Sequence, residues 1–337
     1  MADPRDSAVG NGFPMAFEQP ISRLERQIAE LEKTSSSGGR DYTSEIRQLR
    51  AQYVSMLRKT YQNLSAWETV QVARHPSRPQ AADYIGRIVK NFVELHGDRC
   101  FGDDAAAVCG MGRIGTEKVM LIAQQKGRET KEKLARNFGM CHPEGYRKVL
   151  RVMKLAEKFR LPVVSLIDTA GAYPGVGSEE RGVAEAIARN LMEMSRLRTP
   201  STCVVIGEGG SGGALGFGGV ADRIGIMEYA YYSVISPEGC ASILWRTGEK
   251  APEAAEAMKL TARELKKLDV VDDIIPEPLG GAHRNPAEAF ANLEHHIVRT
   301  LRELRRIPIE NLLEYRYARW RRMGKVLRLD PQPVAAQ

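Results

Sequence analysis

The chain has 337 residues, of which 43% are hydrophobic and 27% charged, and its formal net charge at pH 7 is +7. These values are ordinary for a globular protein and exclude global disorder, a collagen-like fibre and a coiled coil. No stretch approaches the roughly 18 consecutive apolar residues of a membrane span, so we expect no contact with a membrane. The N-terminal residues show no apolar stretch of the secretory type. Five scattered cysteines without a C-x-x-C pair argue against a zinc ribbon and favour a reduced, cytoplasmic location.

The first predicted elements are two helices within residues 20–64. Apolar residues recur there at spacings of three and four on both sides of a Ser/Gly-rich turn at residues 35–39. This pattern is typical of a helical hairpin with one apolar stripe on each helix. The hairpin either packs on its own body or forms a subunit contact, and the sequence does not separate these two interpretations.

From about residue 105 the sequence predicts strands alternating with helices. A strand pair bends at Gly115–Thr116 and is followed by a helix over 145–159, a nearly all-apolar strand over 163–168 and a helix capped by Ser178. A second buried strand over 202–208 leads to a short Gly-rich helix near 213–220. Two more strands and a helix that Ser236 caps complete the series. Such alternation predicts parallel strands joined by crossover helices.

Positive charge is concentrated towards the C-terminus. Residues 299–328 hold ten Lys or Arg and three acidic residues, and ten minus three equals the net charge of the whole chain. A basic segment of this kind binds nucleic acid, contacts an acidic partner or is solvated. No RNA-reading motif accompanies it, so we expect a solvated or partner-facing surface, with nucleic-acid binding left open.

The densest motif lies at residues 206–214, where five of the seven residues from 207 to 213 are glycine. Three functional interpretations compete with a plain turn in which no Cβ fits. Gly207, Gly209 and Gly212 match a dinucleotide-binding fingerprint. Ser211 between Gly209 and Gly213 matches the nucleophile elbow of a serine hydrolase. Consecutive glycines before a helix also suit an oxyanion hole made of backbone amides.

The oxyanion-hole interpretation survives best because it requires no side chain. The Gly-rich helix is too short for a dinucleotide fold, and no Lys follows the glycines as in a phosphate P-loop. A hydrolase requires a downstream histidine. His295 and His296 lie in an amphipathic helix, and His283 lies in a Gly/Asn/Pro loop where we expect a surface position.

A second candidate loop at residues 168–175 also follows a buried strand, at the strand end where open α/β sheets bind ligands. It presents the amides of Gly171 and Ala172. Asp168 acts there either as a base or as a turn cap, and Tyr173 either lines a pocket or fills one.

A third candidate loop is basic. Five Lys/Arg and two acidic residues lie between residues 126 and 136, and Lys126 and Arg128 head this stretch. The loop either meets phosphate groups or forms a solvated charged face, and the two interpretations carry equal weight.

Ten motifs in order along the chain carry a family resemblance. They are FEQPI (17–21), ARHPSRP (73–79), QKGRETKEK (125–133), NFGM (137–140), PEGYRK (143–148), IDTAGAYPGVG (167–177), EERG (179–182), IGEGGSGGAL (206–215), YSVISPEGCASILW (232–245) and IIPEPLGGAHRNP (274–286). Together they resemble the α subunits of bacterial acetyl-CoA carboxylase carboxyltransferase, over about residues 17 to 300. The sequence departs from the family pattern at two places, where Ala170 replaces a usual Pro and Gly216-Phe217 replaces a more usual small/aliphatic pair. Both departures affect the details of the binding pocket rather than the expected activity.

The resemblance implies an α/β fold of the crotonase-like (ClpP/crotonase) type, a superhelix of ββα units. With the hairpin and basic tail, this predicts an N-terminal arm and first helix over 1–41, a carboxyltransferase domain over 42–298 and a basic helical tail over 299–337. It also implies no metal in this chain, because the zinc ribbon belongs to a β subunit in an α2β2 assembly.

The implied reaction moves the carboxyl group of carboxybiotin, held on a separate biotin carboxyl carrier protein, to acetyl-CoA. The product is malonyl-CoA, in the first step of fatty acid biosynthesis, and ATP is used by a separate biotin carboxylase. The resemblance assigns the oxyanion hole that faces biotin to the amides of Gly212 and Gly213. The residues expected to bind substrate are Gly209, Gly210, Gly171, Ala172, Tyr173, Lys126 and Arg128.

Overall fold

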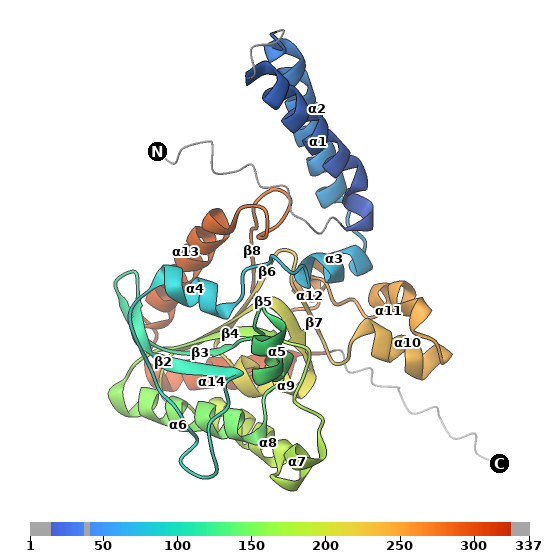
Figure 1. Ribbon diagram of the computed structural model, residues 1–337. Helices are drawn as coiled ribbons and strands as arrows, with labels where there is room; N and C mark the ends of the chain where they lie inside the picture. The colour runs from blue at the N-terminus through green and yellow to red at the C-terminus, as the bar shows by residue number, and fades with distance from the viewer. Residues whose placement is uncertain (1–14, 37–40, 325–337) are drawn as a thin grey trace, which may run out of the picture.

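The computed structural model describes residues 15–36 and 41–324. Its centre is a mixed sheet in the order β1-β2-β3-β4-β5-β6-β8, with β7 paired to β5 beside this path (Figure 1). The strands are β1 (Val89–Glu94), β2 (Ala107–Ile114), β3 (Glu117–Gln124), β4 (Val163–Thr169), β5 (Ser201–Gly210), β6 (Arg223–Met227), β7 (Tyr231–Ser233) and β8 (Asp273–Ile275).

The strand directions divide the sheet into two parts. β1, β2 and β3 pair antiparallel, and the bend at Gly115–Thr116 joins β2 to β3 as predicted. From β3 to β8 every pair is parallel. β4 and β5 are buried along their whole length, which explains why both read as almost uninterrupted apolar runs.

Helices cover both faces of the sheet. α6 and α8 lie together on one face, while α4 and α13 lie on the other (Figure 1). The helices of the body are α3 (Ala66–Ala73), α4 (Ala81–Ile88), α5 (Thr130–Ala135), α6 (Pro143–Phe159), α7 (Val176–Glu180), α8 (Val183–Ser195), α9 (Ser211–Gly218), α10 (Pro237–Trp245), α11 (Ala251–Ala257), α12 (Ala262–Lys267), α13 (Pro286–Leu304) and α14 (Ile309–Arg322).

The helices within residues 20–64 are α1 (Gln19–Ser36) and α2 (Thr43–Gln62), and they project from the body as an antiparallel pair (Figure 1). Only the base of the pair is fixed. Tyr61 packs there with Tyr229 of the body. Arg284 forms ion pairs with Glu18 at 2.7 Å and Glu25 at 2.5 Å.

The predicted cap at Ser178 is wrong. Ser178 lies inside α7, and the long helix begins at Val183 after Gly182, whose φ of 76° breaks the chain between the two helices. A residue in the left-handed conformation changes the direction of the chain here, so that one helix ends and another begins. Glycine adopts this conformation without steric cost.

The basic tail is also not wholly solvated. α13 runs across residues 298 and 299, so the predicted domain boundary falls inside a helix. In α14, Arg316 is buried and its Nε donates to Asp222 Oδ1 at 2.7 Å, while its other nitrogens bond backbone carbonyls. The expected solvated or partner-facing surface is therefore wrong for Arg316, which fixes α14 to the body.

Candidate functional site

The glycine-rich segment lies where β5 ends and α9 begins, directly against the loop that follows β4. A Cβ on Gly210 would lie 2.1 Å from the carbonyl oxygen of Ala170, and one on Gly213 would lie 2.3 Å from the carbonyl carbon of Gly171. Real Cβ atoms do not approach backbone this closely. The structure thus brings two of the predicted loops together, and Gly210 and Gly213 are required for their contact.

Gly212 differs from its neighbours. A Cβ there would meet only the Ile187 side chain at 3.7 Å, an ordinary contact, and Gly212 is not among the glycines with positive φ. Neither packing nor backbone conformation therefore demands glycine at this position. Half-buried Gly212 lies between half-buried Ser211 and buried Gly213 at the start of the helix.

The first turn of α9 presents backbone donors. The first N–H groups of a helix have no acceptor within the helix, and the capping residue, Gly210, has no side chain to supply one. The amides of Ser211, Gly212 and Gly213 occupy this turn, at the positive end of the helix dipole. This arrangement suits an oxygen atom that carries negative charge.

Ser211 has a φ of 53°, a left-handed conformation that costs energy for a residue with a Cβ. A hydrolase would need a histidine at hydrogen-bonding distance from its hydroxyl. In the part of the chain that the structure describes, the His142 ring is within hydrogen-bonding distance of a different serine, with Nδ1 2.9 Å from Ser178 Oγ.

Tyr173 closes the β4 loop. Its amide donates to the carbonyl of Cys141 at 3.1 Å, and its ring lies against the His142 ring with centroids 4.5 Å apart. Ala172 is half-buried beside it. His142 was not singled out by its sequence, although it directly precedes Pro143 at the start of α6.

Lys126 is occupied by carboxylates rather than open to a ligand. Its Nζ lies 2.8 Å from Asp168 Oδ1 and also donates to Glu208. Glu208 further accepts from Arg74 Nε at 2.7 Å and from the Tyr231 hydroxyl at 2.5 Å. Burial alone raises the pKa of Glu208, but the charges of Lys126 and Arg74 outweigh it and lower the pKa to about 2.

Arg128 lies outside this cluster. It is exposed, and its guanidinium donates to Asp83 Oδ2 at 2.5 Å and to the carbonyl of Pro76 at 3.4 Å. The structure therefore separates Lys126 and Arg128, although the sequence places them in one basic loop. Gly209 is near the glycine turn as predicted, with Tyr232 packed where its Cβ would be.

The expectation of a surface position for His283 is wrong. The segment 274–286 folds against the segment 73–79, so that the His283 ring stacks on His75 with centroids 4.1 Å apart. Burial and the nearby charges of His75, Arg284 and Arg78 lower the pKa of His283 to about 2. His283 is therefore a buried, neutral residue packed against His75.

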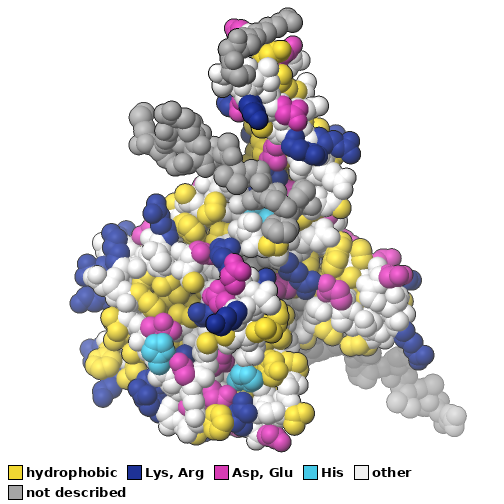
Figure 2. All heavy atoms as spheres, viewed as in Figure 1, with side chains coloured by type: hydrophobic (Ala, Val, Ile, Leu, Met, Phe, Trp, Pro, Cys, Tyr) yellow, Lys and Arg dark blue, Asp and Glu magenta, His cyan; other side chains and the backbone are white. Residues whose placement is uncertain are grey.

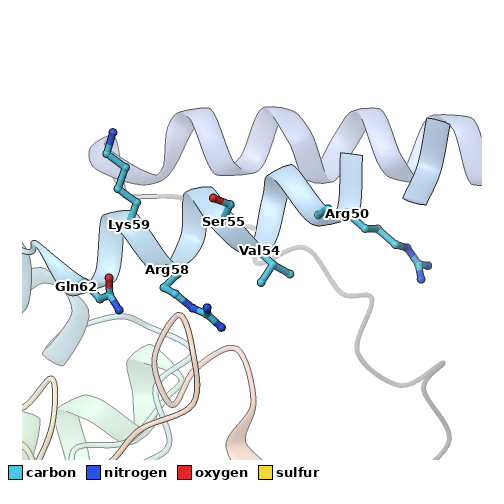
Figure 3. A pocket seen from close by; sticks show the side chains of 7 residues that line it. Arg50, Val54, Ser55, Arg58, Lys59 and Gln62 are labelled. Carbon is cyan, nitrogen blue, oxygen red and sulfur yellow. The ribbon is translucent and has the colours of Figure 1, made fainter. Parts of the chain in front are cut away.

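Two grooves lie beside helices α2 and α3. One of about 720 Å³ is lined by seven residues of α2, with Val54 and Arg58 pointing away from α1 (Figure 3). A second of about 460 Å³ lies between α3 and Glu238. Within residues 15–36 and 41–324, no group of three or more His, Cys, Asp or Glu side chains is placed to hold a metal ion. In the same residues no helix is long and apolar enough to cross a bilayer.

Comparison with solved structures identifies the fold. The transcarboxylase 12S hexamer structure matches with a TM-score of 0.57 at 21% identity, over 68% of this chain and 43% of that one. The β subunit of geranyl-CoA carboxylase from P. aeruginosa matches with 0.53 at 18% identity, over 73% and 46%. A Pseudomonas malonate decarboxylase hetero-tetramer in complex with coenzyme A matches with 0.53 at 17% identity, over 66% and 91%.

Sequence comparison is more specific. The family described as "Acetyl co-enzyme A carboxylase carboxyltransferase-like" matches residues 14–324. A protein of Vibrio campbellii named acetyl-coenzyme A carboxylase carboxyl transferase subunit alpha is 54% identical over 313 residues, which cover 92% of this chain and 98% of that protein. The protein of the same name from Thioalkalivibrio sulfidiphilus is 55% identical over 303 residues, or 90% and 95% of the two chains.

The mixed sheet and its covering helices have the crotonase fold of these carboxyltransferase structures, as the sequence predicted. More narrowly, the chain belongs to the acetyl-CoA carboxylase carboxyltransferase family, and its relatives in that family are α subunits.

Proposed function

We propose that this chain, with a β subunit, transfers a carboxyl group from carboxybiotin to acetyl-CoA and so forms malonyl-CoA for fatty acid biosynthesis. The observation that carries the proposal is the first turn of α9. Its backbone N–H groups have no capping side chain, and the space beside Gly212 is not filled by neighbouring atoms. A small oxygen-bearing group fits such a turn, because no side chain covers the amides.

Carboxybiotin, when bound, supplies CO2 and afterwards accepts the proton of the acetyl methyl group at its ring nitrogen. The contribution of this chain is electrostatic. The amides of Gly212 and Gly213 would face the ureido oxygen and stabilise the negative charge that develops there, and the rigid contact of Gly213 with Gly171 holds them in place. Loss of one such donor typically costs about 3 to 4 kcal/mol.

The β subunit is the partner that family membership implies, and we place it over an apolar surface beside the turn. Val234 follows Ser233, which pairs with Gly210, and is 78% exposed. Val176 of α7 and Ile243 and Leu244 of α10 are also largely exposed. Figure 2 shows hydrophobic side chains on the visible side of the α10–α11 unit. Apolar residues in such number beside a site are typical of a protein interface.

The remaining parts of the proposal follow from the family resemblance. The β subunit would bring the zinc ribbon and the second oxyanion hole, for the thioester oxygen, in an α2β2 assembly. A biotin carboxyl carrier protein would deliver carboxybiotin, a separate biotin carboxylase would use ATP, and the complex would lie in the cytoplasm. Gly171, Ala172 and Tyr173 stay predicted substrate contacts, since they adjoin the turn.

The deciding experiment is Gly212→Ala in the complex with the β subunit. Its methyl group fits the fold but would lie where the oxygen approaches the amides, so kcat for malonyl-CoA formation should fall on the order of 100-fold. Thermal stability should not fall, because Ala favours a helix more than Gly does. The control is Gly86→Ala at an exposed position of α4, where a Cβ has no neighbour within 4 Å. Full activity of Gly212→Ala would refute the assigned turn.

A further inference from the structure

We propose that Arg74, Lys126, Asp168 and Glu208 form a positioning cluster that holds the α9 amides in their reactive arrangement. The inference rests on the proposed function. None of the four side chains needs to touch a substrate, because each acts through the backbone segment that carries it.

The cluster joins four separate parts of the chain. Arg74 ends α3, Lys126 follows β3, Asp168 lies at the end of β4 and Glu208 lies near the end of β5. Two contacts of Lys126 and one of Arg74 tie these carboxylates together. Asp168 Oδ1 also accepts the backbone N–H of Glu208 at 2.9 Å. The Glu208 backbone is thus held by Asp168 directly, and its side chain is held through Lys126.

The cluster lies next to both site loops. Gly209 and Gly210 follow Glu208 directly, and Ala170 and Gly171 follow Asp168 within three residues. These are the loops whose backbones meet at Gly210 and Gly213. A shift of either carboxylate would therefore move one loop against the other, and a displacement of about 1 Å at a reacting group can cost about 100-fold in rate.

Two glycines are explained by the cluster. A Cβ on Gly207 would lie 2.6 Å from Asp168 Oδ1, and one on Gly139 would lie 2.8 Å from Lys126 Cγ. Glycine at these two positions leaves room for the side chains of Asp168 and Lys126, which any larger residue would displace. The dinucleotide fingerprint assigned Gly207 to a phosphate turn, whereas here it makes room for a carboxylate.

The cluster pairs its charges closely. Arg74 and Lys126 face the carboxylates of Asp168 and Glu208, and Glu238 of α10 adds a third carboxylate 2.5 Å from Arg74. The side chains of Asp168 and Glu208 are each only 7% exposed. Removing one member of such a buried group leaves an uncompensated charge, which forces its partners to move or to bind protons.

The test is Lys126→Met in the complex with the β subunit, with kcat and KM for acetyl-CoA measured separately. We expect kcat to fall about 10- to 100-fold with KM nearly unchanged, because the substrate contacts remain while the amides shift. The matched control is Lys131→Met, an exposed lysine five residues along the same basic segment.

The pH profile supplies a second readout that a purely structural role would not move. In the wild type the pKa of Glu208 lies at about 2, with Arg74, Lys126, Asp168, Tyr231 and Glu238 around it. The ionised form of Glu208 therefore persists until the pH falls towards that value. Removal of Lys126 takes away the largest of the effects that lower this pKa while burial remains, so the pKa of Glu208 should rise and the acid limb of kcat should move to higher pH.

Glu208→Gln provides an independent route if Lys126→Met does not assemble. It keeps the size of the side chain and should lower kcat in the same way. The double variant should lose less than the sum of both single effects, because the unpaired charge is gone. Unchanged kcat and pH profile in an assembled variant would overturn the inference, and so would failure of both single variants to fold. An inactive wild-type complex would instead refute the proposed function.

Discussion

Single glycines in this site serve different purposes, although the sequence presents them as one run. Gly210 and Gly213 allow two backbones to touch, Gly207 admits a carboxylate, and Gly212 has room for a side chain that it does not carry. Replacement of Gly212 therefore tests ligand binding without disturbing the packing, whereas replacement of Gly213 would disturb the packing and the catalytic amides together. Overpacking of this kind typically costs about 1 to 3 kcal/mol.

Ser211→Ala separates the carboxyltransferase from the hydrolase at the residue scale. A nucleophilic serine would lose nearly all activity on removal of its hydroxyl, whereas a serine that contributes only its amide should keep kcat within about threefold. The comparison needs only steady-state malonyl-CoA formation by the two complexes. A loss of more than about 1000-fold, the range seen when a nucleophile is removed, would favour the hydrolase.

At the scale of elements, long-range polar contacts of buried arginines fix β5 and α14 to the body. Arg78 donates to the carbonyl of Ile206 at 2.9 Å and pairs with Glu277, which anchors β5 just before the glycine turn. Burial lowers the pKa of Arg78, but the charge of Glu277 outweighs it and raises the pKa, so the buried guanidinium stays charged. α14 is held in the same manner by Arg316 and Asp222.

Arg316→Met tests the anchoring of α14. The change leaves the buried Asp222 carboxylate without its cation and should lower the free energy of unfolding by about 3 to 5 kcal/mol. Chemical denaturation of the purified chain measures this directly. Arg321→Met on the exposed side of the same helix should change it by less than about 0.5 kcal/mol. Equal effects of the two changes would contradict the role of the buried pair.

For the whole molecule, the sheet body carries two projections, the α1–α2 hairpin and the α10–α11 unit (Figure 1). The α10–α11 unit adjoins the glycine turn through β7, which pairs with Glu208, Gly209 and Gly210. The β-subunit contact proposed for its exposed apolar residues would therefore lie beside the glycine turn. Water would then be excluded from the turn only in the assembled enzyme, which strengthens the electrostatic effect of the amides.

Ile243→Glu tests this arrangement of subunits. A charge at a position that is 72% exposed should leave the isolated chain folded but weaken co-purification with the β subunit at least tenfold. Phe159→Glu at the end of α6 is a suitable control, since Phe159 is 59% exposed on another part of the surface. Normal assembly of the Ile243 variant would place the partner elsewhere.

Sequence patterns predicted the features that depend on neighbouring residues. β4 and β5 followed from apolar runs, and the glycine turn followed from its composition. The pairing of charges did not follow, because Lys126 meets a glutamate 82 residues further along the chain. For the same reason His283 and Arg316 were expected at the surface, although distant segments cover them. The break at Gly182 was missed because a left-handed turn has no apolar periodicity.

The central position of β5 has a consequence for synthesis on the ribosome. β1, β2 and β3 are neighbours in sequence and pair antiparallel, so they can associate as soon as they emerge. The free edge of β3 stays unpaired until β4 has been synthesised. The other edge of β4 can then pair only with β5, which itself also pairs with β6 and β7. A nascent chain stalled before residue 201 would expose an unpaired apolar strand edge, the kind of surface on which chains aggregate.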